Sequence, residues 1–542
     1  MSSTITDSGA TSGTVGALTK NGTGLLDLSN GSKNAVALNA ASTIAVNGGQ
    51  LRIGTNTIEN ANAISLASGT ELQTLQGGSG AFASNITGGG LVHVESGILQ
   101  LTGTGNNYTG GTTLEVGTTL LATTATLSHA ANQTITNAGG TLVLDQTTSG
   151  NFTAVMSDGV PGLEDGGTPG PSQPGSFVKA DSTGSSGGNV TITNAQLYTG
   201  ATTVEAGTLT LGATNAVATS GGVTLGTVGG GATANLALGA NNTVQGLNSV
   251  AGNTTGVQLD GNALTVQQAS GATSSFGGNI SDTGAGSLNT SGGGTLALSG
   301  SNSIGGTMAV GTGTTFSQTG GSLAIAGSVT NNGTFSVSGT TASFGGTFTN
   351  NGLYISDPST QTFNNLTESP NGAIQAAAGD LYKVGGNFSN ASTQSTTWNT
   401  IGAGLEFITG SVTNHILGLA GSDLGAIEGG YSENFAWGTL TIDAGNSLTL
   451  EDGLIGKNKV AFYVEGLLGA DVSGDDITNI TGDGFNIYYN PLDTANAYLG
   501  GLTYDLADGG ELIADPVPEP ASLALLLTGL SGVVVARRRK RA

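Results

Sequence analysis

The chain has no cysteine and few charged residues. The absence of cysteine among its 542 residues excludes disulfide bonds and thiolate metal sites. Charged residues make up 9% of the chain, against about 25% in ordinary soluble domains. Five of the 12 Lys and Arg residues occupy positions 537–541, so residues 1–536 carry seven basic residues against 35 acidic ones. This charge excludes nonspecific nucleic-acid binding and leaves cations or neutral polysaccharides as the expected neighbours.

Glycine and short apolar strings are what the chain has in excess. It contains 96 glycines, and 37% of its residues are apolar. Disordered chains combine low hydrophobicity with a high density of charge, and this chain does not. The composition therefore favours a folded β protein whose short strands are separated by glycine turns.

A short repeat recurs in the second half of the chain. The strings are IAGSVTNNG at 325–333, FGGTFTNNG at 344–352 and VGGNFSNAS at 384–392. Their offsets correspond to one and two turns of about 20 residues, which fits one coil of a β-helix. We therefore predict an all-β, elongated, right-handed parallel β-helix (solenoid), with about 25 coils over residues 1–515. Asn331-Asn332 and Asn350-Asn351 are expected at corners, with left-handed backbone and stacked amides.

A longer motif recurs at wider spacing. It reads YTGGTTLEVGTTL at 108–120, YTGATTVEAGTLTL at 198–211 and SIGGTMAVGTGTTF at 303–316, with Ile304 in place of Tyr, and LTKNGTGLLDLSNGS at 18–32 matches its opening. These residues resemble the autotransporter-associated β-strand repeat of large bacterial surface β-helices. In physical terms, the glycines suit coil corners, and Thr and Val suit stacked strands.

Composition divides the chain into three predicted parts. Residues 1–435 are a Gly-rich parallel β-helix with a loop insertion at about 157–188, where four prolines (Pro161, Pro169, Pro171 and Pro174) interrupt the strand pattern. Residues 436–515, which are richer in aromatic and acidic residues, form a terminal β section made either of final coils or of capping antiparallel strands. Residues 516–542 form a tail.

The sequence predicts no catalytic, cofactor or metal site and no enzymatic activity. The histidines (His93, His129 and His415) have no partner at metal-ligand spacing. Arg52 is the only arginine outside the tail, which disfavours a polysaccharide lyase. A hydrolase with paired carboxylates stays open, although Glu451-Asp452 and Asp475-Asp476 would point to opposite faces of a strand. The acidic stretch 471–483 is expected to be a solvated loop, with calcium binding as the alternative.

The tail combines three elements in a fixed order. Val517, Pro518, Glu519 and Pro520 precede an uncharged segment at 521–536, and Arg537, Arg538, Arg539, Lys540 and Arg541 follow it. Sixteen helical residues span about 24 Å of a hydrocarbon core of about 30 Å, so we predict a C-terminal transmembrane helix at about 521–536. The positive-inside rule places the basic stop at 537–541 in the cytoplasm.

This order of elements resembles the PEP-CTERM sorting signal. The resemblance implies a Gram-negative bacterium, export through the Sec translocon, transient anchoring in the inner membrane, processing by an exosortase-type enzyme, and exopolysaccharide as a further partner. Residues 1–20 contain no secretory signal pattern, so we expect a signal peptide upstream of this start. The expected function is that of a non-enzymatic structural or adhesive protein of the cell surface or extracellular matrix. The alternative is a carbohydrate-binding or carbohydrate-degrading β-helix protein of the same compartment.

Overall fold

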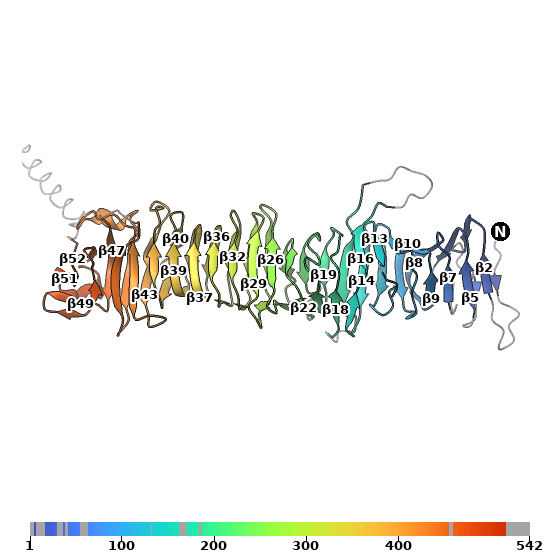
Figure 1. The fold of residues 1–542 in the computed structure, drawn as a ribbon, viewed down its shortest axis with the longest axis horizontal. Helices are drawn as coiled ribbons and strands as arrows, with labels where there is room; N and C mark the ends of the chain where they lie inside the picture. The colour runs from blue at the N-terminus through green and yellow to red at the C-terminus, as the bar shows by residue number, and fades with distance from the viewer. Residues whose placement is uncertain are drawn as a thin grey trace, which may run out of the picture. The chain divides into compact units, whose positions relative to one another are not determined.

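The computed structural model describes residues 5–6, 17–29, 36–37, 42–54, 63–131, 133–161, 171–183, 187–454 and 459–515. The chain divides into two compact units, Met1–Gly321 and Ser322–Ala542. In each unit most strands pair in parallel with the equivalent strand of the next turn (Figure 1). The fold is an all-β parallel β-solenoid of the right-handed type, as predicted, with about 21 turns. Fewer turns form than the expected 25 because some are longer than 20 residues: Leu142 pairs with Phe177 in the next turn.

The strands of unit 1 belong to several sheets that run along the solenoid. One of them contains β3 (Leu25–Asp27), β6 (Gln50–Gly54), β8 (Glu71–Phe82), β10 (Leu91–Leu101), β11 (Thr112–Leu114), β12 (Thr119–Ala122), β13 (Thr134–Asn137), β14 (Thr141–Asp145), β16 (Val155–Asp158), β17 (Ser176–Ala180), β19 (Thr202–Val204), β21 (Val223–Leu225) and β24 (Leu247–Ser249). A second contains β15 (Gly150–Phe152), β18 (Asn189–Ile192), β20 (Gly207–Leu211), β22 (Thr233–Leu238), β25 (Thr254–Gln258) and β28 (Asn279–Ser281).

The remaining strands of unit 1 lie at its two ends. Near the start are β1 (Ile5–Thr6), β2 (Ala17–Lys20), β4 (Val36–Ala37), β5 (Thr43–Val46), β7 (Ala63–Leu66) and β9 (Asn85–Gly88). Near the end are β23 (Asn242–Val244), β26 (Ala263–Gln267), β27 (Thr273–Phe276), β29 (Ser287–Ser291), β30 (Thr295–Leu298), β31 (Asn302–Ile304), β32 (Met308–Val310) and β33 (Thr315–Gln318).

The core of unit 1 is a stack of apolar side chains inside the coil. Strands alternate inward and outward residues, and the inward Leu120, Leu142 and Phe177 lie in register on consecutive turns with no exposed surface. Burying such a side chain contributes roughly 1.5–3 kcal/mol. Each turn is therefore stabilised mainly by the turns above and below it.

The longer sequence motif makes the same buried contact in its two close copies. The Tyr108 hydroxyl lies 2.8 Å from Thr112 Oγ1, and the Tyr198 hydroxyl lies 2.6 Å from Thr202 Oγ1. In the third copy Ile304 is the buried equivalent, next to the strand that begins at Met308. The motif therefore serves packing, and its membership of the autotransporter-associated family stays a prediction.

Part of the segment predicted as a loop insertion at 157–188 belongs to the solenoid. Gly159 and Gln173 form an antiparallel bridge within this segment. Strand β17, which lies inside the predicted segment, pairs in parallel with β14. The prolines do not interrupt β17 because all of them precede Ser176. The segment predicted as a loop insertion therefore includes a strand of the solenoid.

The described residues of unit 2 form two short 3-10 helices and the remaining strands. Its elements are β34 (Ser322–Ile325), β35 (Val329–Asn331), β36 (Thr334–Ser338), β37 (Thr341–Asn350), β38 (Leu353–Asp357), β39 (Thr360–Glu368), β40 (Ala373–Ala376), β41 (Leu381–Val384), β42 (Phe388–Asn390), β43 (Thr400–Phe407), β44 (Asn414–Leu419), η2 (Glu428–Tyr431), β45 (Trp437–Ile442), β46 (Ser447–Asp452), β47 (Ala461–Leu468), β48 (Val472–Ser473), β49 (Asp476–Thr481), β50 (Asn486–Tyr489), η3 (Thr494–Leu499), β51 (Tyr504–Ala507) and β52 (Glu511–Ala514).

The short repeat of unit 2 falls in register as predicted. Asn331 pairs with Asn350, Asn350 with Glu368, and Glu368 with Asn390. The amides stack, since Asn331 Nδ2 donates to Asn350 Oδ1 at 2.8 Å across 19 residues. The expected left-handed backbone at these asparagines was wrong, because neither they nor their neighbours Asn332 and Asn351 have a positive φ. Asn331 and Asn350 are the last residues of strands, so extended backbone suffices.

Aromatic rings stack beside this amide ladder. Phe344 and Phe363 are in register with ring centres 4.9 Å apart, and Phe335 and Tyr354 are in register at 5.5 Å. Towards the end of the described chain, strands β45, β47, β50 and β52 continue the parallel pairing, while β48–β49 and β51–β52 are antiparallel hairpins. Segment 436–515 thus contains both alternatives considered from sequence.

Candidate functional site

A row of polar side chains lies on the outer face of β3, β6, β8 and β10 in unit 1. Asp27, Arg52, Gln73 and His93 are in register on these four strands. The neighbours of these residues along each strand point into the core. Leu51 on β6, for example, has no exposed surface. Strand alternation therefore places polar groups from four turns next to one another.

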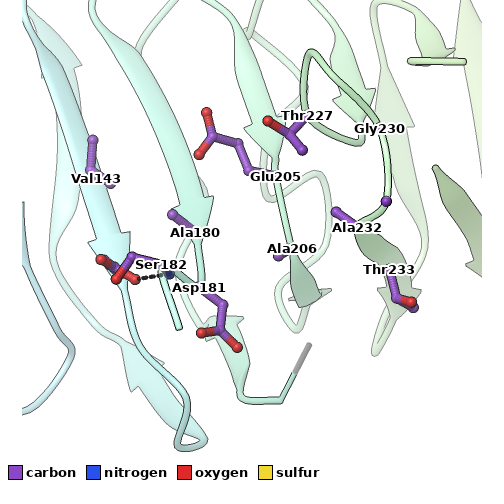
Figure 2. Close-up of a pocket in the computed structure, with 12 residues that line it drawn as sticks. Val143, Ala180, Asp181, Ser182, Glu205, Ala206, Thr227, Gly230, Ala232 and Thr233 are labelled. Atoms are coloured by element: carbon purple, nitrogen blue, oxygen red, sulfur yellow. Dashed lines mark hydrogen bonds between the residues drawn. The ribbon is translucent and has the colours of Figure 1, made fainter. Parts of the chain in front are cut away.

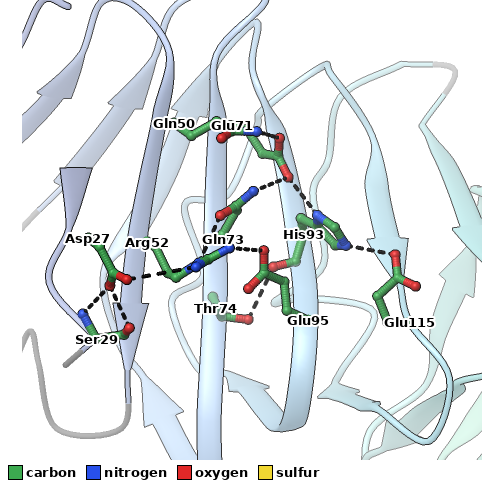
Figure 3. Close-up of polar contacts among 10 residues, drawn as sticks. All are labelled: Asp27, Ser29, Gln50, Arg52, Glu71, Gln73, Thr74, His93, Glu95 and Glu115. Atoms are coloured by element: carbon green, nitrogen blue, oxygen red, sulfur yellow. Dashed lines mark hydrogen bonds and ion pairs between the residues drawn. The ribbon is translucent and has the colours of Figure 1, made fainter. Parts of the chain in front are cut away.

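His93 lies between two carboxylates, as Figure 3 shows. Its Nδ1 is 2.6 Å from Glu71 Oε1, and its Nε2 is 2.9 Å from Glu115 Oε1. Burial alone would lower the pKa of His93, but the hydrogen bonds to Glu71 and Glu115 outweigh it and raise the pKa above its usual value. Burial would raise the pKa of Glu71, but the hydrogen bonds from His93 and Gln50 lower it overall. The cluster therefore favours a charged imidazolium between two carboxylates.

Arg52 contacts Asp27 and Gln73 of this row, and also Glu95. Its guanidinium donates to Gln73 Oε1 at 3.0 Å and to Glu95 Oε1 at 3.1 Å, and it lies 3.7 Å from Asp27. The only arginine outside residues 537–541 is thus held by carboxylates of its own unit. Both nitrogens of His93 are also engaged. We therefore assign this cluster the role of joining consecutive turns.

This cluster was not predicted from sequence. His93 was expected to have no ligand partner, because no second histidine or carboxylate lies at metal-ligand spacing from it. The available signal was the turn length: Gln50 and Glu71 are 21 residues apart, and Glu71, His93 and Glu115 follow at steps of 22. Aligning acidic and basic residues at the period of the repeat would have placed them together.

A second candidate is an acidic pocket of about 530 Å³ beside β14, β17 and β19 (Figure 2). Asp145, Asp181 and Glu205 line it. Asp145 Oδ1 accepts the backbone N–H of Ser182 at 2.8 Å, and Asp181 Oδ1 accepts the backbone N–H of Thr183 at 3.1 Å. In Figure 2 the carboxylate of Glu205 points away from that of Asp181. Asp145 and Asp181 therefore stabilise the turn that contains Ser182 and Thr183.

Next to this pocket lies a buried lysine. Lys179 has no exposed surface, and its Nζ donates to the carbonyl oxygens of Gln146, Ala180 and Ala206 at 3.2, 2.7 and 3.1 Å. Burial lowers its pKa, and the neighbouring Asp181 and Asp145 oppose this shift. The ammonium is occupied by three backbone acceptors.

The acidic stretch 471–483 forms an exposed hairpin. Strands β48 and β49 are joined across Gly474, which has a φ of +67°. The side chain of Asn479 closes the base by accepting the N–H of Asp471 at 2.8 Å and donating to the carbonyl of Gly469 at 2.7 Å. Within the part of the chain that the structure describes, no group of three or more His, Asp or Glu side chains could hold a metal ion.

The fold defines the class of the protein, a parallel β-solenoid. Beyond its last strand, residues 516–540 match the PEP-CTERM protein-sorting motif. The match includes Val517, Pro518, Glu519, Pro520, Arg537, Arg538, Arg539 and Lys540, and Arg541 follows it. The motif implies an exported protein that is anchored through its C-terminus and processed by an exosortase. No curated protein and no solved structure was found to match the chain.

The predicted sorting residues and the predicted membrane helix at 521–536 lie outside the described residues. Among the residues that are described, no helix is long and apolar enough to cross a membrane.

Proposed function

We propose that the protein is a non-enzymatic structural component of the cell surface or extracellular matrix of a Gram-negative bacterium. The main observation in support is that the PEP-CTERM motif begins two residues after β52, the last described strand of the solenoid. On this proposal the solenoid is the part of the protein that is exported, and the tail is its sorting signal. The polar clusters support a structural role because their groups bond to one another across turns.

The sorting part of the proposal concerns Sec export, transient inner-membrane anchoring and exosortase processing. We propose that Pro518-Glu519-Pro520 is the recognised element, because proline holds the chain extended ahead of the apolar segment 521–536. The basic residues 537–541 hold the C-terminal end in the cytoplasm. An acidic body with few basic residues is then released into surroundings that contain exopolysaccharide.

The test replaces Pro518, Glu519 and Pro520 by alanine in the native host. Wild-type protein recovered outside the cell is expected to have an intact mass that lacks the basic tail, whereas the variant keeps the tail and stays in the membrane fraction. A matched control replaces Pro171, Ser172 and Pro174, which also removes two prolines. Recovery of the triple tail variant outside the cell at the wild-type mass would overturn the proposal.

A second candidate is a carbohydrate-degrading protein of the same compartment. The acidic pocket with Asp145, Asp181 and Glu205 is the observation that favours it. A reducing-sugar assay of the purified protein on neutral polysaccharides decides between the two. Activity that disappears in Glu205→Gln would replace the structural proposal with an enzymatic one.

A further inference from the structure

A second pocket, of about 390 Å³, lies in unit 1 where the β15–β28 sheet begins. Strand β15 is the end strand of that sheet. In the preceding turn the chain forms a bend at 124–127 instead of a strand. Residues of this bend and of β15 line the pocket. The irregular start of the sheet therefore leaves a hollow between two turns.

The side chain of Gln133 lines this pocket without a hydrogen bond. It is 5% exposed, and neither its Nε2 nor its Oε1 has a partner among the residues that the structure describes. Every other buried Asn or Gln side chain described in unit 1 makes at least one hydrogen bond, and those residues are Gln73, Asn106, Asn137, Gln146, Gln196, Asn242, Gln268, Asn302 and Gln318. An unsatisfied buried amide destabilises a fold by about 1–3 kcal/mol. The exception therefore points to a group from outside the chain.

The rest of the lining defines what that group can be. No Asp, Glu, Lys or Arg lines the pocket. Leu127, Ile135 and Phe152 form apolar walls, while the exposed His129 and Asn151 stand at the rim. A charged ligand would find no permanently charged counter-ion here, and a purely apolar one would leave the amide unpaired.

We propose that this pocket binds one neutral sugar ring of a glycan. A pyranose presents C–H faces to apolar walls and vicinal hydroxyls to an amide. Gln133 Nε2 donates to one hydroxyl and Oε1 accepts from its neighbour. A neutral peptide could also pair with an edge strand, but β15 has only three residues and the bend at 124–127 occupies its open side. The space suits a compact ring better than an extended chain.

Sugar binding goes beyond the proposed function, because export determines only whether the pocket is exposed to a glycan. The two are therefore tested separately, this one with the purified full-length chain. The probes are N-acetyl-D-glucosamine, methyl α-D-glucopyranoside and methyl α-D-galactopyranoside, with D-galacturonate as a charged comparator and N-acetyl-trialanine amide as a peptide comparator. Binding is measured by saturation-transfer NMR and isothermal titration calorimetry.

The decisive variant is Gln133→Leu, which removes the amide and keeps a side chain of similar size. It is expected to weaken binding of the neutral sugar about tenfold or more, since two hydrogen bonds are lost. Its thermal stability should stay the same or rise, because no existing hydrogen bond is broken. The matched control is Gln318→Leu, which breaks bonds to Gly300 and Gly320 carbonyls. It should lower stability and leave sugar binding intact.

Three outcomes would overturn the proposal. One is that no neutral sugar binds the wild-type chain, which would assign the pocket to solvent only. Another is that the peptide comparator binds and the sugars do not. The third is that Gln133→Leu binds sugar as tightly as the wild-type chain while Gln318→Leu behaves as expected.

Discussion

Glu368 offers a sharp test of how the solenoid of unit 2 is stabilised. Its side chain has no exposed surface and stands in the ladder of Asn331, Asn350 and Asn390. Asn350 Nδ2 donates to Glu368 Oε2 at 2.8 Å, while Oε1 has no hydrogen-bond partner among the described residues. Burial raises the pKa of this carboxyl well above its usual value, and the hydrogen bond from Asn350 opposes the rise only in part.

The sign of the pH dependence follows from the raised pKa. Between the usual pKa of 4.5 and the higher folded-state pKa, the folded protein holds a proton that the unfolded chain has lost. The free energy of unfolding therefore falls as pH rises through this window. This loss of stability amounts to about 1.36 kcal/mol for each pH unit between 4.5 and the folded-state pKa, so at pH 7 it is at most about 3 kcal/mol.

The perturbation is Glu368→Gln, which keeps the shape and removes the titrating group. We expect the free energy of unfolding to rise by up to about 3 kcal/mol at pH 7, with little change at pH 4. Both tryptophans of the chain, Trp398 and Trp437, lie in unit 2, so their fluorescence during guanidinium titration reports the unfolding of this unit. The control is Glu451→Gln, which removes an exposed carboxylate of the same unit.

The reasoning would be refuted if Glu368→Gln were no more stable than the wild-type chain at pH 7. It would also fail if both proteins lost stability equally between pH 4 and pH 7. A gain of the same size in Glu451→Gln would point to overall charge instead of the buried site.

Three further predictions concern unit 1, with unfolding followed by circular dichroism. Because the pKa of His93 is raised, its ion pairs stabilise the fold below pH 6.5, and this stabilisation is lost as pH rises through the folded-state pKa. His93→Gln should therefore lower the free energy of unfolding by about 1.5–3 kcal/mol at pH 5 and by clearly less at pH 9. An equal loss at both pH values would contradict this prediction. Gly88→Ala should destabilise the fold by more than about 2 kcal/mol, because φ at Gly88 is +95° and a Cβ there would lie 2.2 Å from the Leu66 carbonyl oxygen. The control Gly69→Ala, which has open space around it, should cost about 1 kcal/mol. Equal losses in the two variants would show that the close contact at Gly88 relaxes. Lys179→Met should destabilise by about 1–3 kcal/mol because three carbonyls lose a donor, and unchanged stability would show that water replaces the ammonium.

Much of the fold could be predicted from sequence because a solenoid repeats its local pattern. The offset between the strings at 325–333 and 344–352 gave the pairing of Val329 with Phe348. The glycine and strand pattern gave the parallel coil. The limits of the loop at 157–188 could not be fixed, because the strand Ser176–Ala180 is recognisable only through its pairing with Thr141–Asp145.

The sites divide in the same way. The sorting tail is a linear signal, so Val517 to Pro520 and the basic residues could be found by reading along the chain. The contacts of His93, Glu71 and Glu115 depend on which residues share a position in successive turns. The free amide of Gln133 depends on which neighbours fail to reach it, and residue type alone does not show that.

The sequence by itself determined the class of fold, the acidic character of the body and the order of elements in the tail, because periodicity, composition and short linear motifs are local properties. Only the tertiary structure decided which polar groups meet across turns and which are left without a partner. The physical reason is that hydrogen bonding and burial depend on the exact register of each turn. Changes in turn length, such as the long turn between the paired residues Leu142 and Phe177, alter that register in ways the repeat does not predict.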